Sequence, residues 1–262
     1  MRYRDFGQDR RIQLTAIPVC VGEVGWRVVL QRHDLERRLR ADGAATVITR
    51  LALRAAPGPV TIVSRLEADV TIQGAHDETG RAYLNMWAAL EDAGDGTPAA
   101  YMFAEHVVTR LKGPREARLV TAIDGIDTSA PWTRCVAEAL MRPSPGWSPL
   151  GDAWTDPAEV VFGLDHTDGN RHVNTLVFPR LAIDAGLRRL AQQRAEGPLR
   201  ASAMEVGYRK PCFAGERMRI LVRTFEVDEG GYGVCAWLSA GEGLRPHITA
   251  RIRYVVTAVS SR

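Results

Sequence analysis

The sequence is poor in lysine and has no strong excess of charge of either sign. Lys112 and Lys210 are its only lysines, so arginine supplies the rest of its 34 basic residues. Against 31 acidic residues these give a net charge of only +3, with no basic tail, which argues against nucleic acid as the partner. The arginine excess leaves two explanations open, a phosphate-binding surface and the codon bias of a GC-rich genome.

Motifs for disulfides, metals and membranes are also lacking. The four cysteines form no CxxC pair and no metal-like Cys/His spacing, so we expect no metal site and no cofactor. Residues 1–11 contain no apolar leader, and no run of 18 apolar residues occurs. These absences predict a soluble cytoplasmic protein with reduced thiols and no membrane partner.

The second half of the chain has the clearer pattern of elements. A short apolar strand at 157–164 precedes a polar turn at 165–172. Apolar residues at helical spacing then predict a helix over 174–194, with Pro179 in its first turn. Alternating apolar and polar residues predict four antiparallel strands after it: 199–209, 217–227, 232–239 and 246–258.

The first half repeats this order of elements. A helix is expected over 24–41, followed by strands at 59–72, 81–91 and 99–110. We therefore predict an α+β protein of two tandem units, 1–124 and 157–262, joined by a linker at 125–156. Aligning the expected helix starts places Cys20 opposite His172, so that the first unit has lost the polar residues of the second.

The polar segment 165–175 contains two acids, two histidines and two amides directly before an apolar helix. Its pattern Asp-x-Asn-x-His-Val-Asn at 168–174 resembles the hot-dog fold acyl thioesterases, and is closest to the double hot-dog acyl-acyl-carrier-protein (acyl-ACP) thioesterases. The resemblance implies a double hot-dog fold, in which an antiparallel sheet wraps around a central helix in each unit. It also implies a catalytic set of four residues: Asp168, Asn170, His172 and Asp184.

Further residues are implied to contact the substrate: His166, Asn174, Thr175, Tyr208 and Arg209. The segment 208–212 resembles the family's Y-R-R-E-C, but Pro211 stands where the family has glutamate. Cys212 matches a cysteine proposed as a nucleophile in that family. We do not assign it that role, because no acid adjoins it in the sequence.

The chemistry follows from what thioester hydrolysis requires. A water must become nucleophilic and the carbonyl oxygen must be stabilised as it gains charge. Asp168 or Asp184 could activate the water, His172 could carry the proton, and Asn170 or the helix N-terminus could hold the oxygen. Purely structural roles remain open for several residues: a turn for Asp168, a helix cap for Asn174, an inert exposed side chain for His166 and a solvated helix position for Asp184.

We therefore predict an enzyme that hydrolyses an acyl-ACP or acyl-CoA thioester, in fatty-acid or polyketide metabolism. A dehydratase, or an acyltransferase or decarboxylase acting on a carrier-bound acyl group, is the alternative within the same fold. A non-catalytic protein that binds acyl thioesters is the alternative from another class. A homodimer is also possible, since the sequence does not settle whether two chains associate.

Overall fold

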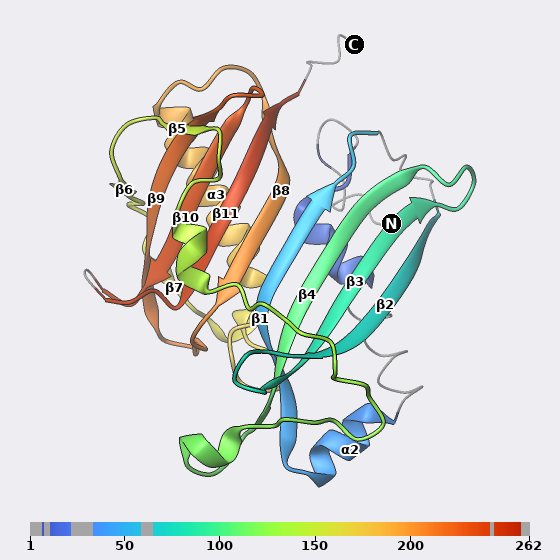
Figure 1. Cartoon of the computed structure of the whole chain (residues 1–262). Helices are drawn as coiled ribbons and strands as arrows, with labels where there is room; N and C mark the ends of the chain where they lie inside the picture. The colour runs from blue at the N-terminus through green and yellow to red at the C-terminus, as the bar shows by residue number, and fades with distance from the viewer. Residues whose placement is uncertain (1–6, 8–10, 22–33, 59–64, 242–243, 258–262) are drawn as a thin grey trace.

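The computed structural model describes residues 7, 11–21, 34–58, 65–241 and 244–257 (Figure 1). An 11-stranded sheet runs through the molecule, with the long helix α3 (Val177–Gln192) behind it in this view. Four long strands come from the first half: β1 (Ala44–Ala55), β2 (Leu66–His76), β3 (Ala82–Asp92) and β4 (Pro98–Arg110). Four more come from the second half: β8 (Leu199–Tyr208), β9 (Arg217–Val227), β10 (Tyr232–Ser239) and β11 (Ile248–Val256). The predicted α+β architecture is confirmed.

Short elements connect these strands. The remaining strands are β5 (Trp147–Pro149), β6 (Trp154–Thr155) and β7 (Val160–Val161), and all three pair with β9. The short helices are η2 (Leu14–Ala16), α2 (Leu35–Ala41), η3 (Arg115–Arg118), η4 (Ala137–Met141) and η5 (Leu164–His166). Strands β5 and β6 lie inside the predicted linker 125–156, so its last residues add to the edge of the second half's sheet. The predicted unit boundaries remain a prediction.

The strand order shows how the two halves are related. The sheet runs β2-β3-β4-β1-β8-β11-β10-β9. From each outer edge toward the middle, the strands of one half follow the same order: second, third, fourth and then first in the chain. The first strands of the halves, β1 and β8, pair antiparallel from Arg50 opposite Gly207 to Arg54 opposite Ala203. This order is what a duplicated unit with an approximate twofold axis between β1 and β8 would produce.

Strand β1 was missed in the sequence. No element was predicted at 44–55, and the first strand was expected at 59–72, whereas β2 begins at Leu66. The overlooked signal is the β-branched run Thr-Val-Ile-Thr at 46–49, which favours a strand. The residues after it, Arg-Leu-Ala-Leu-Arg-Ala at 50–55, are helix formers and obscure that signal. Pairing with strands on both sides, and burial of Leu51 and Leu53, override this local preference.

The first-half helix begins earlier than predicted. Residues 14–21 are already helical, α2 covers only 35–41, and positions 22–33 of the predicted helix lie outside the described residues. Cys20 is therefore inside a helix, and its alignment with His172 at a helix start is wrong. The overlooked signal is Pro18, which falls in the first turn as Pro179 does in α3.

Helix α3 lies on the sheet of the second half through small residues. Ala182, Ala185 and Gly186 are buried on its sheet-facing side. A Cβ added at Gly186 would lie 2.6 Å from the hydroxyl oxygen of Tyr254 on β11, so only glycine permits this close approach. The same hydroxyl donates a hydrogen bond to the carbonyl oxygen of Ile183 at 2.8 Å, which fixes the helix on the strand.

Candidate functional site

The predicted catalytic segment forms a tight two-stranded turn directly before α3. Thr167 and Val173 pair as an antiparallel bridge, and the Asp168 N–H donates to the His172 carbonyl oxygen at 3.0 Å. Val173 is buried, whereas the turn beyond it is exposed. Residues that face one another across an antiparallel pair project to the same side. The turn therefore brings Asp168 and His172 together on one side.

Each residue of the turn has a distinct local role. Asp168 Oδ1 accepts the Asn170 N–H at 2.8 Å, which leaves Oδ2 without a bond inside the turn. Arg171 takes the left-handed conformation at φ 64°, and its N–H donates to the Asp168 carbonyl oxygen. The His172 ring packs edge-on against Phe213, with centroids 5.1 Å apart. The turn-forming role foreseen for Asp168 is present, and its second oxygen stays available for chemistry.

His166 lies before the turn and is half-buried rather than exposed. Its Nδ1 accepts the Gly163 N–H at 3.1 Å, and its ring meets Phe162 edge-on at 5.9 Å. Since Nδ1 is an acceptor, the neutral ring carries its proton on Nε2. His166 thus closes the η5 turn.

The start of α3 is organised by Asn174. Its side-chain oxygen accepts the Leu176 N–H at 2.9 Å, and its carbonyl oxygen accepts the Val177 N–H at 3.0 Å. Pro179, two residues on, has no N–H. The N-cap residue of α3 is Leu176, without a side-chain cap bond, so Asn174 forms a turn just before the helix rather than the cap foreseen for it. The helix start nevertheless has fewer unused donors for a substrate oxygen than the sequence suggested.

Tyr208 and Thr175 meet beside the helix start. The Tyr208 hydroxyl donates to the Thr175 carbonyl oxygen at 3.1 Å, and its ring packs against Phe178. Burial raises the pKa of Tyr208, so the phenol remains a hydrogen-bond donor. This contact holds the segment before α3 against β8.

Arg209 is engaged with the backbone. Its guanidinium donates to the carbonyl oxygens of Pro246 and Arg245, the latter at 2.8 Å. This binds the end of β8 to the segment before β11.

Asp184 is separated from the other predicted catalytic residues. It lies seven residues after Val177, which places it about 10 Å further along the helix axis. It shares the exposed face of α3 with Arg180 and Arg188. Partial burial raises the pKa of its carboxyl, and the two arginines oppose that shift. Contacts thus join Asp168, Asn170 and His172, whereas no hydrogen bond or ion pair among the described residues joins Asp184 to them.

A second cluster of reactive side chains adjoins the turn. Ligand atoms of Cys212, Glu216 and His247 all lie within 4.8 Å of one another, with Cys212 Sγ 3.5 Å from His247 Nδ1. An acid therefore does lie near Cys212, contrary to the expectation from sequence. Burial raises the pKa of Cys212 to about 12, so the free side chain is a thiol. Burial lowers the pKa of His247, and the positive charge of Lys210 lowers it further.

One backbone hydrogen bond in the first half resembles the bond that joins Asp168 to His172. The Gly7 N–H donates to the Arg11 carbonyl oxygen at 2.8 Å, as Asp168 does to His172. The next residue, Ile12, is buried in the same core as Val173. Matching the turns in this way places Gly7 opposite Asp168 and Arg11 opposite His172, while the counterpart of Asn170 lies outside the described residues. At these two described positions the first half therefore has neither the carboxylate nor the imidazole of the second.

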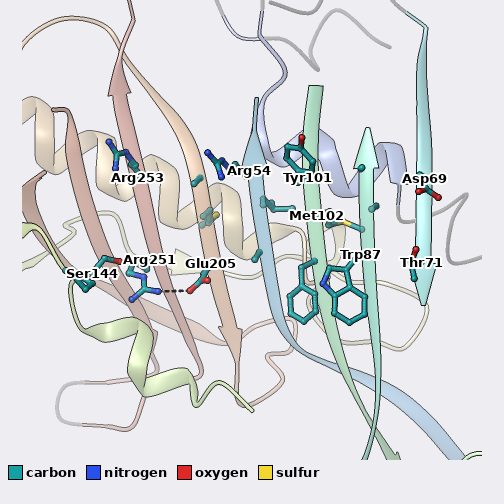
Figure 2. A pocket seen from close by; sticks show the side chains of 18 of the residues that line it. Arg54, Asp69, Thr71, Trp87, Tyr101, Met102, Ser144, Glu205, Arg251 and Arg253 are labelled. Atoms are coloured by element: carbon teal, nitrogen blue, oxygen red, sulfur yellow. Dashed lines mark hydrogen bonds and ion pairs between the residues drawn. The ribbon is translucent and has the colours of Figure 1, made fainter. Parts of the chain in front are cut away.

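A groove of about 620 Å³ lies on the face of the sheet opposite α3 (Figure 2). Trp87, Tyr101 and Arg54 line it, and Arg251 pairs there with Glu205 at 2.8 Å (dashed in Figure 2). None of the sequence-predicted site residues borders this groove. It is separate from the turn before α3.

Comparisons with known proteins identify the fold. No protein-family model matches the chain, and no curated protein matches it. Among solved structures, a putative oleoyl thioesterase from Lactobacillus plantarum is 14% identical, with a TM-score of 0.72 over 99% of this chain and 94% of the other. An acyl-ACP thioesterase from Bacteroides thetaiotaomicron is 15% identical, with a TM-score of 0.65 over 97% and 94%. The 12:0-ACP thioesterase from Umbellularia californica is 15% identical, also at 0.65, over 97% and 91%.

These likenesses extend over nearly the whole chain, so the protein has the double hot-dog fold that the sequence predicted. In the described part of the chain, no helix combines the length and apolar character needed to cross a bilayer.

Proposed function

We propose that the protein hydrolyses an acyl thioester carried by acyl carrier protein or coenzyme A. The observation that carries the proposal is the turn before the central helix of a double hot-dog fold, in which a backbone hydrogen bond pairs Asp168 with His172. The thioesterases to which the whole chain is structurally similar support it. A pathway in fatty-acid or polyketide metabolism and a cytoplasmic location remain predictions.

In the proposed reaction, the Asp168 carboxylate orients a water through its free Oδ2, and His172 takes the proton as the water attacks the thioester carbonyl. The carbon–sulfur bond of the resulting tetrahedral intermediate then breaks, and the thiol leaves with a proton returned by His172. We assign the Asn170 amide to hold the oxygen that gains charge, because Asn174 occupies two donors at the helix start.

Asp168 rather than Asp184 is the carboxylate that orients the water in this proposal. Asp168 shares the turn with His172, whereas Asp184 lies about 10 Å along α3, between two arginines on the helix face. The proposal thus gives Asp184 no direct part in activating the water.

The test uses substitutions that preserve the turn. Asp168→Asn keeps an oxygen that can accept the Asn170 N–H and removes only the charge, and His172→Gln removes the imidazole. We expect each to lower kcat/KM for thioester hydrolysis by about 10²- to 10⁴-fold, the usual contribution of general acid–base catalysis. Release of the free thiol from a panel of acyl-CoA and acyl-ACP substrates measures the rate.

Arg171→Gly is the matched control. Glycine adopts the left-handed conformation of Arg171 freely, so this variant should keep wild-type activity. A folded wild type that releases no acid from the panel would overturn the proposal. Mass spectrometry of the products distinguishes the alternatives, because a dehydratase yields an enoyl thioester and an acyltransferase yields a transferred acyl group.

A further inference from the structure

Cys212, Glu216 and His247 come from separate parts of the second half but meet at one point. Cys212 and Glu216 lie between β8 and β9, and His247 directly precedes β11. Cys212 and His247 are buried and Glu216 is half-buried. A thiol, an imidazole and a carboxylate are thus gathered at the edge of the core.

The spacing of these three groups fits a tetrahedral metal ion. With Zn–S near 2.3 Å and Zn–N near 2.0 Å, a tetrahedral ion holds its sulfur and nitrogen ligands about 3.6 Å apart. Cys212 Sγ and His247 Nδ1 are 3.5 Å apart. The Glu216 carboxylate lies within 4.8 Å of both atoms, so a shift of about 1 Å would complete the third contact.

The carboxylate is held in place by the neighbouring backbone. Glu216 Oε2 accepts the Phe213 N–H at 3.0 Å, and this bond orients the group as outer hydrogen bonds orient metal ligands. One thiolate, one carboxylate and a neutral imidazole also balance the charge of a divalent ion. This balance matters because Lys210 and Arg209 lie nearby and disfavour any uncompensated positive charge.

We propose that Cys212, Glu216 and His247 bind a divalent ion of the zinc class, with a fourth position left for water. The mixture of sulfur, nitrogen and oxygen ligands favours Zn²⁺ over Mg²⁺ or Ca²⁺, which prefer oxygen alone. Sequence motifs do not reveal this site because His247 lies far along the chain from the other two ligands.

The site would act on the catalytic turn through the backbone. The Cys212 carbonyl oxygen accepts the Val173 N–H at 2.8 Å, and the ring of Phe213 packs against His172. Because Cys212 and Phe213 contact the turn, an ion bound to both Cys212 and His247 would link the turn to the start of β11.

Cobalt substitution tests the proposal without any measurement of catalysis. Co²⁺ titrated into the purified full-length protein should give a thiolate-to-cobalt absorption band that saturates at one equivalent and is displaced by Zn²⁺. Cys212→Ser and His247→Gln should abolish the band, and Glu216→Gln should weaken Co²⁺ binding at least tenfold. Cys235→Ser, which removes another buried thiol, should leave it unchanged.

Circular dichroism of each variant separates loss of the site from loss of the fold, and Zn²⁺ should raise the Tm of the wild type but not of His247→Gln. A folded wild type without the cobalt band, or a band that persists in Cys212→Ser, would overturn the proposal. Because the readout is absorption, its failure would leave the hydrolase proposal intact.

Discussion

Gly186 shows how a single missing side chain determines where a helix lies. Alanine at this position would place its Cβ 2.6 Å from Tyr254 Oη and 3.3 Å from Val234 Cγ1. We expect Gly186→Ala to lower the free energy of unfolding by about 1–3 kcal/mol, the usual cost of overpacking a core, despite alanine's better helix propensity. Urea denaturation measures the change.

The close contact with Tyr254 provides the control. Tyr254→Phe removes the hydroxyl, so Gly186→Ala should lower the free energy of unfolding by less in a Tyr254→Phe protein than in the wild type. The losses of the two single variants should therefore not be additive. Gly169→Ala, with nothing within 4 Å of the added Cβ, should leave stability nearly unchanged. Equal costs for Gly186→Ala in both backgrounds would show that the helix position does not depend on this contact.

His106 on β4 links stability to pH. Burial lowers its pKa to about 4 in the folded protein, against 6.5 for an ordinary histidine, so the unfolded chain binds a proton that the folded protein does not. The free energy of unfolding should therefore fall between about pH 6.5 and 4, by about 3 kcal/mol from this residue alone. The unfolding free energy of the wild type should fall more steeply over that range than that of His106→Gln, and equal pH slopes would contradict the assignment.

At the scale of elements, a buried ion pair holds α3 to the segment before it. The carboxylate of Asp156 is fully buried and accepts the Arg188 guanidinium, with both Nε–O distances at 3.2 Å. Arg188→Ala would leave that carboxylate without its partner, so we expect a loss of about 2–4 kcal/mol in unfolding free energy. Thermal or urea denaturation measures it.

Arg217→Ala is the matched comparison for Arg188. Arg217 pairs with Glu159 at 2.9 Å, but both side chains are largely exposed. Such surface pairs contribute about 0–1 kcal/mol, so this variant should change stability little. If Arg188→Ala and Arg217→Ala lower the free energy of unfolding equally, burial of Asp156 does not determine how much its ion pair contributes.

The elements also show which features the sequence could predict. The second half has strong alternation, and β9 and β10 coincide with the predicted ranges. β1 was not found this way, because its helix-forming second half at 50–55 obscures the β-branched run at 46–49. The helix start near Ile17 was obscured by the glycines that follow it.

The candidate site likewise has one part that the sequence predicts and another that it does not. Asp168, Asn170 and His172 are close in sequence and their turn is local, so a contiguous motif predicts them together. The cluster of Cys212, Glu216 and His247 depends on tertiary contacts between segments, and no short pattern encodes it. A contiguous motif therefore encodes the turn, whereas the cluster forms only when distant segments meet in the folded chain.

At the scale of the whole molecule, one hydrophobic core extends through both halves. Leu51 and Leu53 of β1 belong to the same buried cluster as Phe178 of α3 and Met204 of β8. We expect the two halves to unfold together in a single transition, because neither can open without exposing this shared core. Calorimetry should give a ratio of calorimetric to van't Hoff enthalpy near one, and two resolved transitions would show that the halves are independent.

The strand order has a last consequence, for association between molecules. A sheet that does not close into a barrel leaves two edges, each able to pair with a strand of another chain. At one edge, three short strands from 147–161 cover β9. At the other edge, Pro131 bridges His76 at the end of β2, and the rest of this strand carries the exposed acids Glu67 and Asp69. Added strands thus cover one edge, whereas charge helps to protect the other, so we expect that neutralising these two acids would favour edge-to-edge aggregation.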